Sequence, residues 1–159
     1  MPPNRSIAAL VLAVALSLLP GALGAIATGS SVGTWYQEIE KPDWTPPDAV
    51  FGPVWTLLYV SMGVAVWIVW SHAEGKTRRV AVAMFGTQLL LNAAWSFLFF
   101  GMRSPGWALL EIILLWLAIV VTLVLFTRIR PWAGALLVPY LLWVTFAAAL
   151  NAAIWKINP

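Results

Sequence analysis

Five stretches of the chain are long and apolar enough to cross a lipid bilayer, and this feature restricts the fold more than any other. They cover approximately residues 7–28, 50–70, 80–100, 107–126 and 132–155. A membrane-spanning helix needs about 20 apolar residues. Backbone groups in lipid must be satisfied within the segment, and the stretches do not alternate in polarity as barrel strands do. The sequence therefore predicts an all-α membrane protein, a single five-helix transmembrane domain over residues 1–159.

The composition agrees with a bilayer as the solvent of most of the chain. Of the 159 residues, 62% are hydrophobic and 9% are charged, whereas a soluble domain carries about 25% charged residues. We therefore expect an integral, multi-pass membrane protein in the inner or the outer membrane of a prokaryotic cell. The net charge of +3 is what a few Lys and Arg residues in orienting loops produce, and it indicates no nucleic-acid partner.

Conventional catalytic and metal sites have few candidate residues. The chain has no cysteine and one histidine, His72, which excludes thiolate chemistry and a zinc site built from Cys and His. No pair of titratable side chains indicates general acid–base catalysis. We expect no metal and no cofactor, and the sequence leaves open whether the protein is an enzyme.

The first apolar stretch permits a second interpretation. Arg5, the apolar run at 7–19 and the Pro-Gly-Ala-Leu-Gly run at 20–24 resemble a cleavable signal peptide. The apolar character continues to Ala27, however, and this length is enough to span a bilayer. We interpret the stretch as the first membrane helix.

One connection, residues 29–48, is long and rich in proline and tryptophan, while the others are tight turns. Each proline fixes its own φ, and the residue before it is pushed out of the helical region. The segment is therefore predicted to be extended and stiff, which suits a lid over the bundle better than a flexible linker. The candidate lid residues are Trp35, Lys41, Pro42, Trp44, Pro46 and Pro47.

Three amide side chains and one carboxyl side chain interrupt the apolar spans. Gln88 and Asn92 lie one turn apart in the third span, and Asn151 lies in the fifth. Amides at such positions usually bond across helices, and the alternative is that Asn92 offers a donor to a ligand among the helices. Glu111 lies near the start of the fourth span, so it can reach the interface or pair with Arg103.

Small residues recur at every fourth position in the first span, at Gly21, Ala25 and Gly29. Such a stripe lets helix backbones approach closely. It predicts packing against another helix of the same chain more strongly than it predicts a dimer face.

Tryptophan is over-represented, with 11 residues. Six fall at span ends or in the long connection, where an aromatic belt at the lipid headgroups accounts for most of them. The others lie deeper, and together they would form an aromatic wall suited to a flat, apolar ligand. The deep tryptophans are Trp55, Trp67, Trp95, Trp116 and Trp143.

Several motifs resemble those of one known family. The pattern WYxxxxKPxWxPPxxxFxxVWxxLY runs from Trp35 to Tyr59, and QLLLNAAWSFLFFG begins at Gln88. GWALLE opens the fourth span, and PYLLWVTFAAALN lies in the fifth. Together these blocks resemble the TspO family, which comprises the tryptophan-rich sensory proteins of prokaryotes and the mitochondrial translocator protein. The resemblance covers nearly the whole chain.

The resemblance implies a five-helix bundle, usually a homodimer, with a pocket beneath the first loop. The family binds porphyrins, notably protoporphyrin IX, and synthetic isoquinolines and benzodiazepines, and its animal members bind cholesterol. Some bacterial members promote light- and oxygen-dependent porphyrin breakdown, for which the matching catalytic candidates are Trp55 and Trp143. Carried over by position, the ligand-binding residues are Tyr36, Trp55, Tyr59, Asn92, Trp95, Trp143 and Ala147.

The chain departs from the family at the cholesterol motif, which needs a tyrosine before a basic residue. Here Ala152 stands in that place, between Leu150 and Lys156. The motif is weak even when intact, so we expect no tight sterol binding. The predicted pocket contains no basic residue, and porphyrin carboxylates are therefore expected to lie toward Lys41 or toward water.

Three functions are compatible with these residues. The favoured one is a membrane receptor that binds a porphyrin or a similar flat hydrophobic molecule for sensing, scavenging or transport. The second is a photo-oxidative enzyme that degrades porphyrin. The third is a secondary transporter of tetrapyrroles or sterols, which the lack of an internal repeat disfavours.

Overall fold

The computed structural model describes residues 6–158, except for the side chains of Ala27 and Ser30. Within this range the chain is helical, contains no strand, and has five spans long and apolar enough to cross a membrane. The predicted fold class is thereby confirmed. The spans are α1 (Ile7–Val32), α3 (Asp48–His72), α4 (Gly75–Ser96) with the π-helix η2 (Phe97–Gly101), α5 (Pro105–Ile129), and α6 (Pro131–Ala135) with α7 (Val138–Ile157).

Local sequence explains where several helices begin. The hydroxyl oxygen of Ser6 caps α1 by accepting a hydrogen bond from Ala9 N at 3.2 Å. Pro105, Pro131 and Pro139 lie in the first turns of α5, α6 and α7. A proline there is tolerated because first-turn amides have no partner within the helix.

The fifth span consists of two helices instead of the single helix expected over residues 132–155. α6 ends at Ala135, and α7 begins at Val138 after a short turn. Pro139 explains the break, because it has no N–H for Ala135 O and its ring would clash with that carbonyl in a continuous helix. Within the turn, Leu137 N donates to Gly134 O at 2.9 Å.

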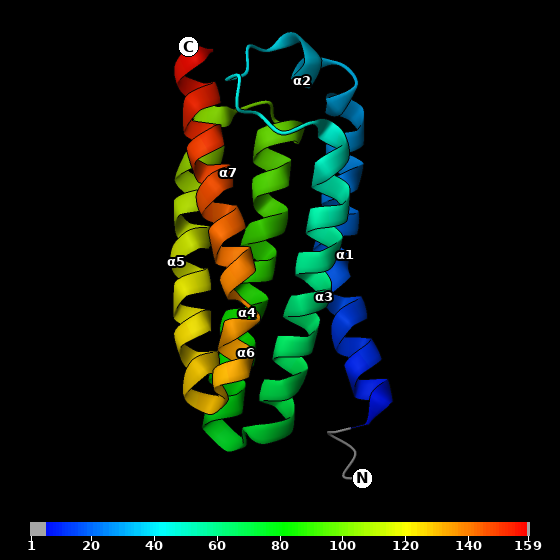
Figure 1. Cartoon of the computed structure of the whole chain (residues 1–159), viewed down its shortest axis with the longest axis vertical. Coiled ribbons are helices and arrows are strands. Elements are labelled where there is room, and N and C mark those ends of the chain that lie inside the picture. Colours follow the sequence, from blue (N-terminus) through cyan, green and yellow to red (C-terminus); the bar gives the residue numbers. More distant parts are fainter. Residues whose placement is uncertain (1–5, 159) are drawn as a thin grey trace.

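The spans pack as an antiparallel bundle (Figure 1). α1 packs against α3 and α4, and α5 lies between α4 and α7. At the end of the bundle away from the long connection, α3 and α5 contribute fully buried side chains to a hydrophobic core, among them Met62, Val69, Ile119 and Phe126. The cavity described below lies nearer the opposite end.

The connection between α1 and α3 is shorter and more structured than expected for residues 29–48. α1 continues to Val32, and the short helix α2 (Trp35–Glu38) follows, arching over the end of the bundle (Figure 1). The Ser31 hydroxyl donates to Phe100 O at 2.7 Å, which ties the end of α1 to η2. A four-residue helix such as α2 is too short to leave a periodic pattern, so sequence reasoning missed it.

Candidate functional site

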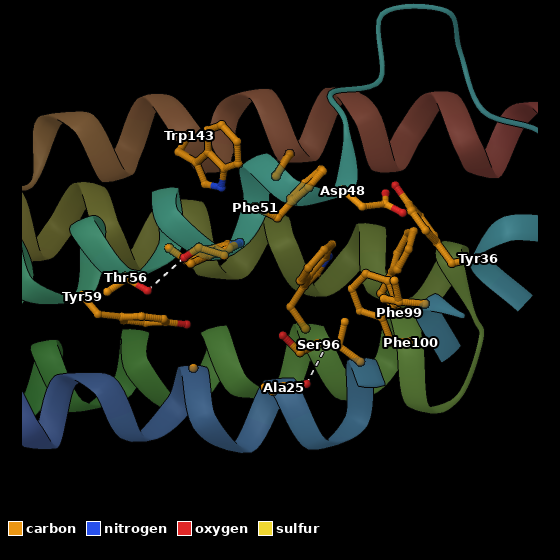
Figure 2. A pocket seen from close by; sticks show the side chains of 18 of the residues that line it. Ala25, Tyr36, Asp48, Phe51, Thr56, Tyr59, Ser96, Phe99, Phe100 and Trp143 are labelled. Carbon is orange, nitrogen blue, oxygen red and sulfur yellow. Dashed lines mark hydrogen bonds between the residues drawn. The ribbon is translucent and has the colours of Figure 1, made fainter. Parts of the chain in front are cut away.

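A cavity of about 550 Å³ lies beneath the loop, bounded by α1, α3, α7 and the region where α4 continues into η2. Its volume is within the range of small-molecule sites, about 300–1,000 Å³. α1 supplies mainly small residues, whereas most of the aromatic ones come from α3 and from the end of α4 with η2, and α7 adds Trp143. Figure 2 shows Phe51, Tyr59 and Trp143 among the side chains that form its walls.

The fold gathers most of the predicted ligand-binding residues around this cavity, including both catalytic candidates. The seventh predicted residue, Asn92, is buried but does not line the cavity. Direct contact between any of these side chains and a ligand stays a prediction. The cavity-lining members of the set are Tyr36, Trp55, Tyr59, Trp95, Trp143 and Ala147.

Aromatic pairs form the wall between α3 and α7. Phe51 lies edge-on to Trp143 with ring centroids 5.8 Å apart, and Trp55 lies edge-on to Tyr140 at 6.2 Å. Trp55 also stacks on Tyr59 at 5.5 Å. Edge-to-face and stacked geometries are the favoured ones for aromatic pairs. The rings therefore form a preorganised surface on which a flat, apolar molecule can stack.

The π-helix η2 places two consecutive phenylalanines on the cavity wall. Its wide turn is closed by a bond from Met102 N to Phe97 O at 2.8 Å. A π-helical turn contains more residues than an α-helical turn, so neighbouring side chains diverge less. Phe99 and Phe100 consequently both line the cavity, and the Phe100 carbonyl is satisfied by Ser31.

A buried hydrogen-bonded cluster joins three helices at the inner end of the cavity. Tyr59 of α3 donates its phenolic hydrogen to Asn92 Oδ1, and Asn92 Nδ2 donates to Tyr140 OH at 3.3 Å. Each of these residues is at most 5% exposed. Both ends of the Asn92 amide are thus used within the protein, which supports its interhelical role and favours it over the ligand-donor role.

Asn151 fixes one of the cavity tryptophans. Its Oδ1 accepts a hydrogen bond from Trp95 Nε1 at 3.0 Å, and its Nδ2 donates to Pro105 O at 2.7 Å. The amide thereby joins α4, α5 and α7. This contact satisfies the indole N–H of Trp95, as a buried indole requires, and it sets the orientation of the ring at the cavity.

Glu111 lies on α5 and is buried, but it does not line the cavity. Neither of its carboxyl oxygens has a hydrogen-bond partner in the part of the chain that the structure describes. Of the two alternatives for Glu111, the pair with Arg103 therefore does not form. Arg103 instead lies at the surface, in a shallow groove beside Trp107 and Trp155.

Sequence reasoning missed the contribution of α1 to the cavity. Gly21 lies against the ring of Tyr59, and a Cβ added to Gly24 would lie 2.9 Å from Ser96 Oγ. Gly21 and Ala25 of the small-residue stripe line the cavity. The stripe was a usable signal, because small side chains leave room beside a helix as well as permitting close packing.

The candidate lid residues lie in the connection between α1 and α3, which includes α2 and which we call the loop. None of them lines the cavity. Trp35 packs edge-on against Phe99 at 5.8 Å, and Trp44 packs edge-on against Phe146 at 5.7 Å. These contacts anchor the loop to η2 and to α7. The remaining candidates are Lys41, which bonds to backbone carbonyls within the loop, and the prolines Pro42, Pro46 and Pro47.

Asn158 fastens the loop to the end of α7. Its Oδ1 accepts from Glu40 N at 3.1 Å, and its Nδ2 donates to Glu40 O at 2.9 Å. One side chain thus satisfies both backbone polar groups of Glu40, as a neighbouring β-strand would. We refer to this pair of bonds as the Glu40–Asn158 clamp.

Replacing Asn158 with alanine is expected to loosen the loop, because the Glu40 backbone loses both partners. Amide hydrogen exchange around Glu40 should accelerate on the order of tenfold, since a hydrogen bond contributes about 1 kcal/mol to local stability. Lys156→Ala, which removes an exposed side chain of the same helix end, is the control. Equal exchange in the Asn158→Ala and control proteins would contradict a restraining role for the clamp.

The pKa of the Tyr36 phenol reflects the burial and the charge at the mouth of the cavity, the edge where Tyr36 and Asp48 lie. Burial, and then the negative charge of Asp48, raises the pKa of Tyr36 from its ordinary value of 10 to about 12. Between these two pH values the unfolded chain has lost the Tyr36 proton while the folded chain keeps it. The free energy of unfolding must therefore fall as the pH rises through this window.

We expect a tyrosinate titration by ultraviolet absorbance to show one group near pH 12 that disappears in Tyr36→Phe. Asp48→Asn should lower the pKa of Tyr36 only part of the way toward 10, because burial is the larger cause. A Tyr36 that titrates at 10 in the folded protein would contradict its burial against the bundle.

The fold and the site together define a class, the multi-pass helical membrane proteins with an aromatic cavity capped by a loop. The chain belongs to the TspO/MBR family, whose model matches residues 11–156. It is an integral, multi-pass membrane protein, and one of its relatives is named as a tryptophan-rich sensory protein.

The similarity extends to bacterial, archaeal and animal relatives. The tryptophan-rich protein TspO of Chlorobaculum tepidum is 43% identical over 98% of this chain and 99% of its own. The corresponding protein of Archaeoglobus fulgidus is 44% identical over 94% of this chain and 96% of its own. The human translocator protein is 41% identical over 78% of this chain and 75% of its own.

Proposed function

We propose that the protein binds a porphyrin such as protoporphyrin IX, or a similar flat hydrophobic molecule, in this cavity for sensing, scavenging or transport. The observation that supports this most is the gathering of Trp55, Trp95 and Trp143 around one apolar cavity of about 550 Å³. Aromatic rings offer broad surfaces for stacking a flat ligand. Related proteins named as a sensory protein and as a translocator protein also support a role that depends on a ligand.

The test is a titration of the detergent-purified protein with protoporphyrin IX in the dark, followed by porphyrin absorbance and tryptophan quenching. We expect saturable binding that Trp143→Ala weakens about tenfold, because the substitution removes one aromatic wall and the edge contact with Phe51. Trp132→Ala is the matched control, since Trp132 lies on α6 and is 79% exposed. Unchanged affinity in Trp143→Ala would remove this cavity as the binding site.

Photo-oxidative degradation is the second candidate function. The observation in its favour is that Trp55 and Trp143 line the same cavity, with Phe51 in contact with Trp143. In this proposal the bound porphyrin absorbs the light, molecular oxygen is the oxidant, and the two indoles lie beside the ring. Illumination of the saturated complex should then change the porphyrin spectrum, more slowly in Trp143→Phe. A Trp143→Phe protein with the same product and rate would exclude this mechanism.

A homodimer is also part of the proposal, as the family resemblance implies. Cross-linking in native membranes should yield a species of twice the chain mass of 17.4 kDa. A monomer at every cross-linker concentration would contradict the dimer and leave the cavity proposal unaffected.

A further inference from the structure

The mouth of the cavity carries a negative charge at Asp48, the first residue of α3. Among the cavity-lining side chains of residues 6–158, Asp48 is the one that is charged. Its Oδ2 accepts a hydrogen bond from Gln37 Nε2 at 2.8 Å. This bond holds the carboxylate at the mouth, close to Tyr36 and Phe51 (Figure 2).

The cation nearest in sequence to this mouth is engaged elsewhere. Lys41 is the one Lys or Arg of loop residues 33–47. Its ammonium group donates to Tyr36 O and to Ile39 O, and it lies 4.7 Å from the centroid of the Tyr36 ring. Two of its three donors are therefore directed at backbone carbonyls. These contacts do not support the expectation that Lys41 receives porphyrin carboxylates.

Apart from Lys41, the other charged residues of the loop make the electrostatic potential at the cavity mouth more negative. They are acidic, at Glu38, Glu40 and Asp43. The charge of Asp48 also acts on the wall itself, because it contributes, after burial, to the raised pKa of Tyr36. A second anion brought to this mouth meets the same potential, which solvent screens in part because the Asp48 side chain is exposed.

We infer that Asp48 is a specificity-determining residue that disfavours ligands with an anionic end at the cavity mouth and favours a neutral hydrogen-bond donor or a cation there. The inference rests on the proposed function and narrows its ligand class. Among porphyrins, a neutral diester or an amine-bearing derivative binds more tightly than the dicarboxylate. The carboxylates of a bound dicarboxylic porphyrin are repelled from the α3 side of the mouth.

The experiment compares protoporphyrin IX with its dimethyl ester in wild-type protein, in Asp48→Asn and in Asp43→Asn. The amide oxygen introduced by Asp48→Asn can still accept the bond from Gln37, and Asp43→Asn removes the same charge from an exposed loop position outside the cavity. Asp48→Asn should tighten binding of the diacid by about threefold, because Asp48 is exposed and the charge that is removed is partly screened by solvent. Binding of the diester should stay unchanged, and Asp43→Asn should alter either affinity by less than about twofold.

A salt series on the wild-type protein gives a second readout that needs no variant. Raising the ionic strength should bring the affinity for the diacid toward that for the diester. A diacid-to-diester ratio that neither Asp48→Asn nor salt changes would overturn the inference while leaving the proposed function intact. If neither porphyrin binds saturably to the wild-type protein, the proposed function fails, and the inference fails with it.

Discussion

Replacing Asn92 with leucine is expected to lower the free energy of unfolding by about 1–3 kcal/mol, a large part of the stability of a domain of this size. Leucine has the same branched shape and the same number of side-chain heavy atoms, although its methyl groups are larger than the amide oxygen and nitrogen that they replace. The phenol of Tyr59 loses its acceptor, and Tyr140 loses the amide that donates to it. Both tyrosines are buried, and a buried polar group without its partner is destabilising because it cannot turn to water.

Gln88→Leu provides the matched control, one turn earlier on the same face of α4. Gln88 is equally buried, its Oε1 has no hydrogen-bond partner within the described chain, and its Nε2 meets Met62 Sδ at 3.8 Å. Removing that amide should be neutral or stabilising. Thermal and denaturant unfolding in the same detergent would measure both variants. Equal losses in the two would show that the cluster contributes no specific stability.

A triple variant distinguishes the two possible causes of destabilisation in Asn92→Leu, which are lost hydrogen bonds and altered packing. When Asn92→Leu is combined with Tyr59→Phe and Tyr140→Phe, no buried phenol is left without a partner. Replacing all partners of a hydrogen bond by apolar groups of the same shape is often nearly neutral. We therefore expect the triple variant to be more stable than Asn92→Leu alone, which is the opposite of additive behaviour.

The second large effect is expected at Gly63, where the backbone of α1 lies close against α3. A Cβ added to Gly63 would lie 2.6 Å from Val14 Cα and 3.0 Å from Val14 N. Backbone atoms cannot turn aside as a flexible side chain can, so α1 must shift as a whole. Gly63→Ala should cost about 1–3 kcal/mol, or roughly 3–10 °C in Tm. It should also weaken porphyrin binding, because α1 supplies one wall of the cavity.

Gly86→Ala controls for the intrinsic effect of adding a methyl group to a helix. Gly86 lies in α4, and a Cβ there meets nothing within 4 Å. This substitution should be neutral or slightly stabilising, because alanine is the better helix former. If Gly63→Ala were as stable as Gly86→Ala, the close approach of α1 and α3 would be wrong.

The five spans follow from the sequence because a bilayer imposes a simple requirement, a continuous apolar helix of sufficient length. The same requirement does not reveal where a span departs from a continuous α-helix. Pro139 interrupts the fifth span without lowering its apolar character, so hydropathy alone does not reveal the break. The wider turn of η2 leaves no compositional sign in the segment FLFFG. Both departures depend on which backbone hydrogen bonds form, and the amino-acid composition does not show this pattern.

The tyrosine and tryptophan positions at the cavity came from motifs, whereas the lining phenylalanines and the polar partners did not. Asn92 and Asn151 are recognisable as interhelical amides, but their partners depend on the rotation of each helix about its axis. Trp95 meets Asn151, and Asn92 meets the two tyrosines, only in the assembled bundle. The sequence places Asp48 between the long connection and the second span, but its place on the cavity wall follows from the return of the connection to α3.

The Glu40–Asn158 clamp links the order of membrane insertion to the completion of the cavity. Glu40 emerges from the ribosome before the second span, whereas Asn158 follows α7 and emerges after the fifth. The clamp consequently cannot form while any helix remains to be inserted. A chain arrested before α7 would present an unfastened loop and an exposed aromatic wall to the insertion and proteolysis machinery. Closing the clamp is thus a late assembly step, because it requires the residue that follows α7.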